Sequence, residues 1–305
     1  MVFQIKNQVS VANLQLPDKC DVEELILRPL LIFYFWITFH QRCSDYICFM
    51  PSRKKRRLIR SVVFIVLSAL LVMVGYIGYQ WWLYGRARFV RYPEFGISIP
   101  IEYSIHGIDV SKYQQMIAWD AVSAMQVKKI KLGFVFIKAT EGIGNTDPQF
   151  KRNWKRSKDA GLIRGAYHFF LATKDGRMQA ENFIKAVDLK TGDLPPVLDI
   201  EQTYGVSKDV IKNEVREWLN IVETNYNIKP IIYTNIDFYK QNLDGDFDDY
   251  PLWVAHYYQP RQPRIKRDWV FWQHNDNGRV NGVLSPVDFD VFSGDSVAFT
   301  QLLIK

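Results

Sequence analysis

The chain has 305 residues, of which 48% are hydrophobic and 15% aromatic, so most of it can fold around a core and intrinsic disorder is excluded. Its net charge of +7 lies entirely in residues 1–100, because residues 101–305 contain 26 basic and 26 acidic side chains. A neutral globular part lacks the broad positive field that nucleic-acid binding requires, and we predict no nucleic-acid partner. The cysteines, Cys20, Cys43 and Cys48, leave the later residues without a disulfide, a thiolate metal site or a cysteine nucleophile.

The first 57 residues are predicted to form a cytoplasmic segment. The apolar run at 29–39 has only 11 residues, too few for a membrane helix. Met50 is followed by a short basic segment and a long apolar run, which is the usual arrangement at the start of an anchored protein. Our hypothesis is that translation begins at Met50 and that residues 1–49 are a gene-model extension. The alternative is a genuine tail or interfacial segment.

Residues 58–85 are predicted to form a transmembrane anchor, with residues 61–85 as its uncharged part. A helix of this length spans about 37 Å, enough to cross a hydrocarbon core of about 30 Å. The basic cluster RKKRRLIR at 53–60 precedes the run, and few basic residues follow it. The positive-inside bias therefore predicts a single-pass cytoplasmic (inner) membrane protein, with the N-terminus inside and residues 86–305 outside. A buried core helix and a cleaved signal peptide are the alternatives.

Residues 86–104 are expected to be a juxtamembrane linker, and residues 105–305 one domain. Eight short apolar runs are predicted strands, at 106–110, 134–139, 164–170, 196–201, 230–234, 251–257, 269–274 and 287–292. Amphipathic stretches predict helices at 116–127, 147–160, 176–188 and 208–226. Strands alternating with helices predict an α/β barrel. Short loops between the last three strands predict that the barrel is irregular at its end.

Carboxylates recur at the predicted strand ends, where functional residues of an α/β barrel collect. Asp109 ends the first strand, Asp199 and Glu201 end the fourth, and Asp288 lies in the last. Residues two apart on a strand point to the same side, so Asp199 and Glu201 face one space. Such a pair raises the pKa of one carboxyl, as general-acid catalysis requires. The alternative is that these acids cap loops or form salt bridges.

Aromatic residues at the strand ends predict a groove for sugar rings, whose apolar faces would pack on flat side chains. They are Tyr167, Tyr233, Trp253, Tyr257 and Trp272. Ordinary core packing is the alternative for each of them. The histidines in or beside strands show no HExxH or HxH spacing, so we predict no metal site and no cofactor.

In its landmarks the sequence resembles the glycoside hydrolase family 25 lysozymes, the Chalaropsis-type N-acetylmuramidases. The resemblance covers roughly residues 105–295 and rests on the order and spacing of several motifs. These are HGIDVSKYQ at 106–114, FVFIKATEG at 134–142, GAYHFF at 165–170, PVLDIE at 196–201, IIYTN at 231–235, LWVAHY at 252–257, WVFWQH at 269–274 and VDFD at 287–290.

The resemblance implies an irregular TIM-like (β/α)5(β)3 barrel that hydrolyses the β-1,4 bond between N-acetylmuramic acid and N-acetylglucosamine. It implies that Glu201 is the general acid and that Asp199 assists it or orients the 2-acetamido group. Asp109 and Asp288 would shape the cleft and tune the charge of the pair. The predicted substrate-binding residues are Tyr167, Tyr233, Trp272, Trp253 and Lys138. Substrate assistance, direct nucleophilic attack and inversion all stay open as mechanisms.

Two positions depart from the family pattern. The usual W-Q-Y reads Trp272-Gln273-His274, and the usual V-D-x-N ends in Asp290. Neither departure removes a catalytic carboxylate. The leading hypothesis is thus a membrane-anchored lysozyme acting on peptidoglycan. The alternative from another class is a catalytically silent glycan-binding module on a membrane stalk, against which the intact acidic pair argues. A chitinase is disfavoured, because LPPVLDIE at 194–201 lacks the D-x-x-D-x-D-x-E pattern.

Overall fold

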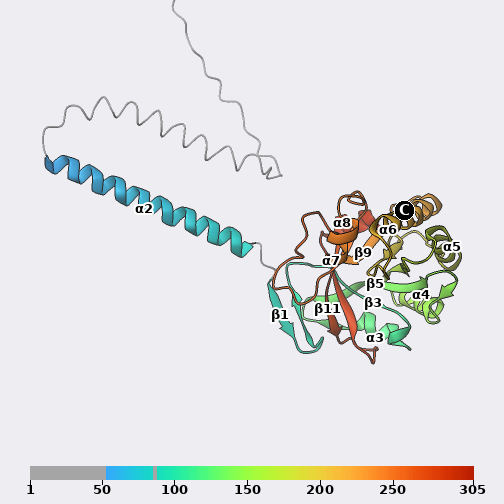
Figure 1. Ribbon diagram of the computed structural model, residues 1–305. Helices are drawn as coiled ribbons and strands as arrows, with labels where there is room; N and C mark the ends of the chain where they lie inside the picture. Colours follow the sequence, from blue (N-terminus) through green and yellow to red (C-terminus); the bar gives the residue numbers. More distant parts are fainter. Residues whose placement is uncertain (1–52, 85–87) are drawn as a thin grey trace, which may run out of the picture. The chain divides into compact units, whose positions relative to one another are not determined.

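The computed structural model describes residues 53–84 and 88–305 (Figure 1). The apolar run at 29–39, the proposed start at Met50 and most of the predicted cytoplasmic segment lie outside the described residues. The chain divides into two units, one ending at Gly78 and one running from Tyr79 to Lys305, and each is described by itself.

Helix α2 (Arg53–Tyr84) has 32 residues. Its part Arg53–Trp82 is long and apolar enough to cross a membrane, and none of the apolar window is buried by other parts of the protein. Large apolar side chains such as Phe64 and Leu71 are each 73% exposed. A helix that is apolar on all sides is stable only when something apolar surrounds it. This argues against a buried core helix and leaves a membrane span or a signal sequence.

The second unit is built on a closed barrel of eight strands (Figure 1). In chain order they are β3 (His106–Val110), β5 (Ile130–Glu141), β7 (Ile163–Phe169), β8 (Val197–Asp199), β9 (Ile231–Asn235), β10 (Leu252–Ala255), β11 (Phe271–Gly278) and β12 (Val287–Phe292). Strand β3 pairs with β5 on one side and with β12 on the other, which closes the sheet. Strand β12 runs antiparallel to both its neighbours, whereas the other barrel neighbours run parallel. The predicted barrel and its irregular end are confirmed.

Helical segments follow most of the strands. They are η1 (Lys112–Gln114), α3 (Trp119–Ala124), α4 (Phe150–Asp159), α5 (Gly176–Ala186), α6 (Lys208–Tyr226), α7 (Ile236–Phe238) with η2 (Tyr239–Leu243), and α8 (Ser296–Leu302). Two-residue strands, β4 (Gln126–Val127) and β6 (Asn145–Thr146), pair with β5. Helix α6 buries its apolar face, as its spacing predicts, through Ile211, Val215, Trp218, Leu219 and Val222. The predicted helices at 116–127 and 147–160 are shorter in the structure, and α7 and α8 were not predicted.

Aromatic side chains fill the interior of the barrel. The rings of Phe136 and Trp253 stack with their centroids 4.3 Å apart. Glycines on the neighbouring strands leave room for them: an added Cβ at Gly107 would lie 2.4 Å from Phe134, and one at Gly165 would lie 2.5 Å from Phe136. The barrel is therefore a packed core, and a site for a ligand is expected at an open end.

The stretch predicted as a linker, residues 86–104, contains a β-hairpin. Strands β1 (Phe89–Tyr92) and β2 (Ile97–Pro100) pair antiparallel. Phe95 and Ile99 are fully buried in the main hydrophobic core, and the Arg279 N–H donates to the Phe95 carbonyl at 2.8 Å. Most of this stretch is part of the barrel unit and not a free tether.

Because Phe95 is fully buried, we expect Phe95→Ala to lower the free energy of unfolding by about 3–4 kcal/mol. The exposed neighbour Glu94 provides the matched control, and Glu94→Ala should change stability by less than about 0.5 kcal/mol. Urea unfolding of the detergent-solubilised chain, followed by tryptophan fluorescence, measures both. Equal small effects would mean that the hairpin does not belong to the folded unit.

Candidate active site

A cleft of about 240 Å³ lies among residues from all eight barrel strands and the loops beyond them. Its lining residues are Asp109, Ser111, Tyr113, Gln114, Lys138, Tyr167, Phe169, Asp199, Glu201, Tyr233, Trp253, Tyr257, Gln273 and Asp288. Eight of the nine predicted site residues are among them, and Trp272 is the exception. The strand-end rule thus brings together four carboxyls from three widely separated parts of the sequence.

Asp109 and Asp288 lie directly opposite each other in the antiparallel pair of β3 and β12. Burial raises the pKa of Asp109 well above its usual range, and the charge of the nearby Asp288 raises it further. Burial also raises the pKa of Asp288 to about 7, with smaller contributions from Asp276 and Glu201. Opposing like charges would be destabilising, so this wall of the cleft retains protons that an exposed aspartate would lose.

Asp199 and Glu201 form the second carboxyl pair. Asp199 is the last residue of β8, and the intervening Ile200 is fully buried in the main core. Both side chains line the cleft, so the two carboxyls act on each other's pKa. Burial raises the pKa of both carboxyls, and the charge of Glu201 raises the pKa of Asp199 further. Two acceptor groups in contact need a proton between them, so the pair shares one.

Lys138 on β5 is the only cation among the cleft-lining residues. Its ammonium pairs with the Glu141 carboxylate at 2.6 Å and lies 4.5 Å from the centroid of the Phe169 ring. Its charge opposes the upward shift of the pKa of both Asp199 and Glu201. One ammonium beside several carboxyls cannot neutralise them all, which keeps proton sharing necessary.

Gln273 on β11 is a central residue of the site that the sequence analysis did not select. Its side-chain N–H donates to Asp109 Oδ2 at 2.6 Å. Its carbonyl oxygen accepts from the Tyr233 hydroxyl at 2.7 Å and from the Tyr257 hydroxyl at 2.6 Å. Gln273 therefore couples two aromatic walls of the cleft to a carboxyl. Gln273 shares the inner face of β11 with Phe271, but both faces of this strand are buried, so alternation alone does not identify it.

The same alternation corrects the prediction for Trp272. Its side chain is fully buried outside the cleft, in a small core cluster with Tyr103 and Val291. Its ring centroid lies 5.9 Å from that of Phe89, and its indole N–H donates to the His256 carbonyl at 3.0 Å. The position of Trp272 supports core packing and not substrate contact. Tyr167, Tyr233, Trp253 and Tyr257 do line the cleft, as predicted.

None of the histidines on the barrel strands lines the cleft. His168 lies with Nδ1 2.7 Å from the Thr140 hydroxyl and Nε2 3.3 Å from the Gln179 side-chain oxygen. Burial lowers the pKa of His168 to about 3, so it is a neutral, hydrogen-bonded wall residue. His106 and His274 are likewise buried, and burial lowers their pKa to about 4 and about 3.

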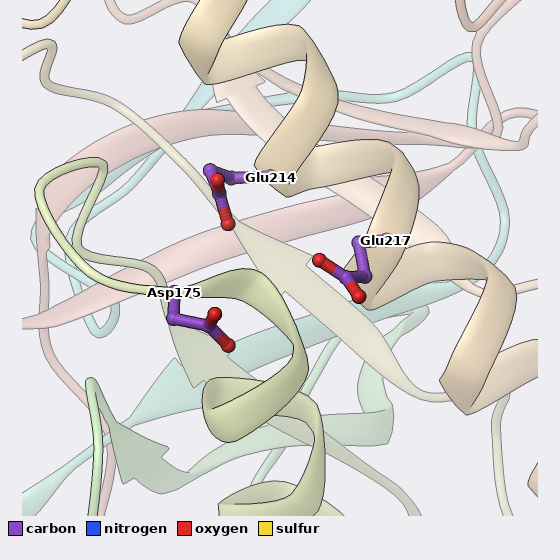
Figure 2. A group of neighbouring side chains, drawn as sticks. All are labelled: Asp175, Glu214 and Glu217. Atoms are coloured by element: carbon purple, nitrogen blue, oxygen red, sulfur yellow. The ribbon is translucent and has the colours of Figure 1, made fainter.

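Figure 2 shows a separate group of carboxylates, Asp175, Glu214 and Glu217, whose oxygens lie within 4.8 Å of one another. Asp175 caps the start of α5. Glu214 accepts the Gly176 N–H at 2.6 Å, and Glu217 pairs with Arg177 at 2.6 Å. These bonds fasten α5 to α6 and account for the three carboxylates. We assign no metal to this group.

The cleft is equipped for acid–base chemistry on a sugar. A carboxyl that keeps its proton can donate it to a leaving oxygen, while a neighbouring carboxylate stabilises positive charge. Paired carboxyl groups are the usual machinery of glycoside hydrolysis. Aromatic side chains on the walls offer flat apolar surfaces to pyranose rings.

Comparison with known proteins identifies the family. Residues 108–283 match the profile of the Glycosyl hydrolases family 25. The chain belongs to glycoside hydrolase family 25. The match covers more than half of the sequence and contains Asp109, Asp199 and Glu201. The chain is thus a glycoside hydrolase of a lysozyme family.

Relatives and solved structures agree with this family. YegX of Escherichia coli K12 is 48% identical over 200 residues, which cover 66% of this chain and 74% of that protein. Lysozyme M1 of Streptomyces globisporus is 34% identical over 219 residues, covering 65% of this chain and 71% of the relative. A family 25 glycosyl hydrolase from Bacillus anthracis superposes with a TM-score of 0.60 at 29% identity, covering 66% of this chain and 94% of that one. The shared part is the barrel unit.

The buried carboxyls give stability a defined dependence on pH. The pKa of Asp288 rises from 3.8 to about 7 on folding, so between these values the folded protein binds more protons than the unfolded chain. Its contribution to stability is fully present below about pH 4 and is lost as the pH rises through about 7. We expect Asp288→Asn to flatten the decline of the unfolding free energy across this window.

Urea unfolding at a series of pH values measures this slope. Glu181→Gln changes an exposed carboxylate on α5 and serves as the matched control, which should keep the wild-type slope. An unchanged slope in Asp288→Asn would contradict the proton uptake inferred for the cleft wall.

Proposed function

We propose that the protein is a membrane-anchored muramidase that cleaves the β-1,4 bond between N-acetylmuramic acid and N-acetylglucosamine in peptidoglycan. One observation carries the proposal: Asp199 and Glu201 line the same aromatic-lined cleft, and burial raises the pKa of both. Relatives of this chain include proteins named as lysozymes and as N,O-diacetylmuramidases. A glycan-binding module would not need a carboxyl pair that shares a proton.

In the proposed reaction Glu201 is the general acid. It is the more exposed member of the pair, so it can reach the glycosidic oxygen and renew its proton from solvent. Proton transfer to that oxygen breaks its bond to the anomeric carbon and leaves positive charge on the sugar. Asp199, 6% exposed behind it, would orient the 2-acetamido group or stabilise that charge. Attack by the acetamido oxygen and attack by water are both compatible with this arrangement.

The remaining cleft residues are proposed to bind the glycan. Tyr167, Tyr233 and Trp253 would present their rings to the sugars, and Lys138 would hold polar substituents near the acidic pair. Asp109 and Asp288 would shape the opposite wall and set the total charge of the cleft. The irregular (β/α)5(β)3 arrangement is the scaffold we propose for this site, with residues 105–305 as its domain and the hairpin at 89–100 as an addition.

The acid role of Glu201 gives a sharp activity prediction. Glu201→Gln should lower muropeptide release from purified peptidoglycan by about a thousandfold or more, because it removes the transferable proton while keeping the shape. The matched control is Glu181→Gln on the exposed face of α5, which should be fully active.

Borohydride reduction followed by mass spectrometry identifies the new chain ends. Muramitol ends that disappear in Glu201→Gln would establish the bond and the residue. Glucosaminitol ends would contradict the proposed bond. Glycan binding with no release by the wild type would favour the alternative of a silent binding module.

The membrane anchor is proposed to be the apolar helix, with the barrel on the outer side of the cytoplasmic membrane. The support is the exposed apolar helix Arg53–Trp82 and the basic cluster that precedes residue 61. We expect alkaline phosphatase fused after Lys305 to be active and the fusion to remain in the membrane after carbonate extraction. Release of the fusion into the soluble fraction would indicate a cleaved signal sequence. An inactive fusion would indicate the opposite orientation, with the barrel on the cytoplasmic side.

A further inference from the structure

Asp290 is a fully buried carboxyl to which the proposed chemistry gives no role. It lies on β12 two residues after Asp288, and in the sheet it is the register partner of Gln273 on one side and Gly107 on the other. Its exposed fraction is 0%. The side chain therefore sits below the cleft wall, out of reach of a substrate. An ionised carboxyl at such a position destabilises the folded protein unless its charge is removed or compensated.

The partners of Asp290 do not compensate a charge. The Trp253 indole N–H donates to Asp290 Oδ1 at 2.8 Å. Asp290 Oδ2 is enclosed and receives no N–H or O–H donor. The Asp109 carboxyl lies within hydrogen-bonding range, and Asp288 is the other charged group that acts on Asp290. None of the ion pairs formed by the described residues includes Asp290.

The direction of the hydrogen bonds around Asp109 is fixed by its other neighbours. Gln273 accepts two tyrosine hydroxyls on its carbonyl oxygen, so its amide N–H group must face Asp109. Asp109 is therefore an acceptor toward Gln273. Toward Asp290, two carboxyl groups meet, and a hydrogen bond between them exists only if one carries a proton. The deeper carboxyl, Asp290, is the one that water cannot stabilise as an anion.

We propose that Asp290 is a permanently protonated positioning residue that donates its O–H to Asp109, so that the two carboxyls together carry a single negative charge. The inference rests on the proposed function, in which Asp109 forms part of the glycan cleft. Burial is the largest effect on the pKa of Asp290 and, together with the nearby Asp288, raises it well above its usual range, while the hydrogen bonds with Trp253 and Asp109 lower it. Donors from Gln273 and Asp290 would then hold Asp109 in one orientation.

The proton on Asp290 has a consequence for the whole site. If both Asp290 and Asp109 were ionised, a second negative charge would raise the pKa of Asp109 and Asp288 and move the pH profile of activity upward. With Asp290 neutral, the charge of this wall is set by Asp109 and Asp288 alone. A neutral carboxylic acid used as a hydrogen-bond donor is a known device in active sites that exclude water.

The decisive variant is Asp290→Asn, which supplies the same acceptor to Trp253 and an N–H donor to Asp109. We expect kcat/KM within about threefold of the wild type and a pH profile displaced by less than about 0.3 units. Replacement of an ionised Asp290 would remove a negative charge and shift the profile to lower pH by about one unit or more. That shift would overturn the proposal.

Infrared difference spectroscopy provides a readout that does not depend on activity. The spectrum of wild type minus Asp290→Asn at neutral pH should contain the carbonyl band of a protonated carboxylic acid. Carboxylate bands in its place would overturn the proposal even if the enzyme has no muramidase activity. If the band of a protonated acid is present but the protein has no muramidase activity, the assignment of a proton to Asp290 stands and only the proposed function is rejected.

Asp290→Leu tests the donor itself, since it removes the O–H that would face Asp109 and leaves the Trp253 N–H without its acceptor. We expect kcat/KM to fall by about ten- to a hundredfold. Thr234→Val alters a fully buried hydroxyl on β9 that has no hydrogen-bond partner, and as a matched control it should keep wild-type activity. Wild-type activity in Asp290→Leu would overturn the positioning role. If that variant does not fold, Asp290→Asn and the infrared spectrum still decide the proposal.

Discussion

The concentration of carboxyl groups at one end of a closed barrel is the constraint on which the site depends. Asp109, Asp199, Glu201 and Asp288 line one cleft of about 240 Å³, with Lys138 as the only lining cation. Water and counter-ions normally allow carboxyls to ionise independently, but burial removes both. The cleft must therefore hold protons at pH values where exposed carboxyls have lost them. Those retained protons make acid catalysis possible near neutral pH.

The hydrogen bonds of the cleft follow from the same constraint. Most buried polar atoms in proteins have a hydrogen-bond partner, and acceptors outnumber donors where acids gather. The hydroxyls of Tyr233 and Tyr257 donate to the side-chain carbonyl of Gln273. The amide N–H of Gln273 in turn donates to Asp109. The inward-facing aromatic residues consequently have two functions. Their rings form the walls of the cleft, and their polar groups satisfy the acidic wall and its neighbours.

Much of the barrel and most of the cleft could be predicted from the sequence, because local rules determine them. Short apolar runs give the strands, and the two-residue alternation places Asp199 and Glu201 in one space. The same alternation did not predict that Gln273 faces the cleft and that Trp272 does not. Alternation separates the two faces of a strand, but both faces of β11 are buried here, so composition does not reveal which one faces the cleft. A large apolar residue was chosen where the polar neighbour is the cleft residue.

Elements that depend on distant contacts escaped prediction for a different reason. The β1–β2 hairpin is too small to be stable alone, and it persists because Phe95, Ile97 and Ile99 are buried in the main core. Helix α8 has seven residues, and its Phe299 ring lies 5.7 Å from that of Phe134, far away in the sequence. Neither segment has a sequence pattern that strongly predicts a strand or a helix. From the sequence alone, each is therefore indistinguishable from a loop.

The depth of each carboxyl in the barrel is matched to the work proposed for it. Glu201 and Asp288 are partly exposed, whereas Asp109 and Asp199 are 7% and 6% exposed and Asp290 is fully buried. A group that gives a proton to the substrate must regain one from water, which suits the outer position of Glu201. A group that holds charge in one place gains from being enclosed, since fixed dipoles replace mobile solvent around it. Asp290, enclosed on all sides, can act only by orienting its neighbour. The roles proposed for proton donation, charge stabilisation and orientation thus fall on carboxyls that differ in burial and hardly in chemistry.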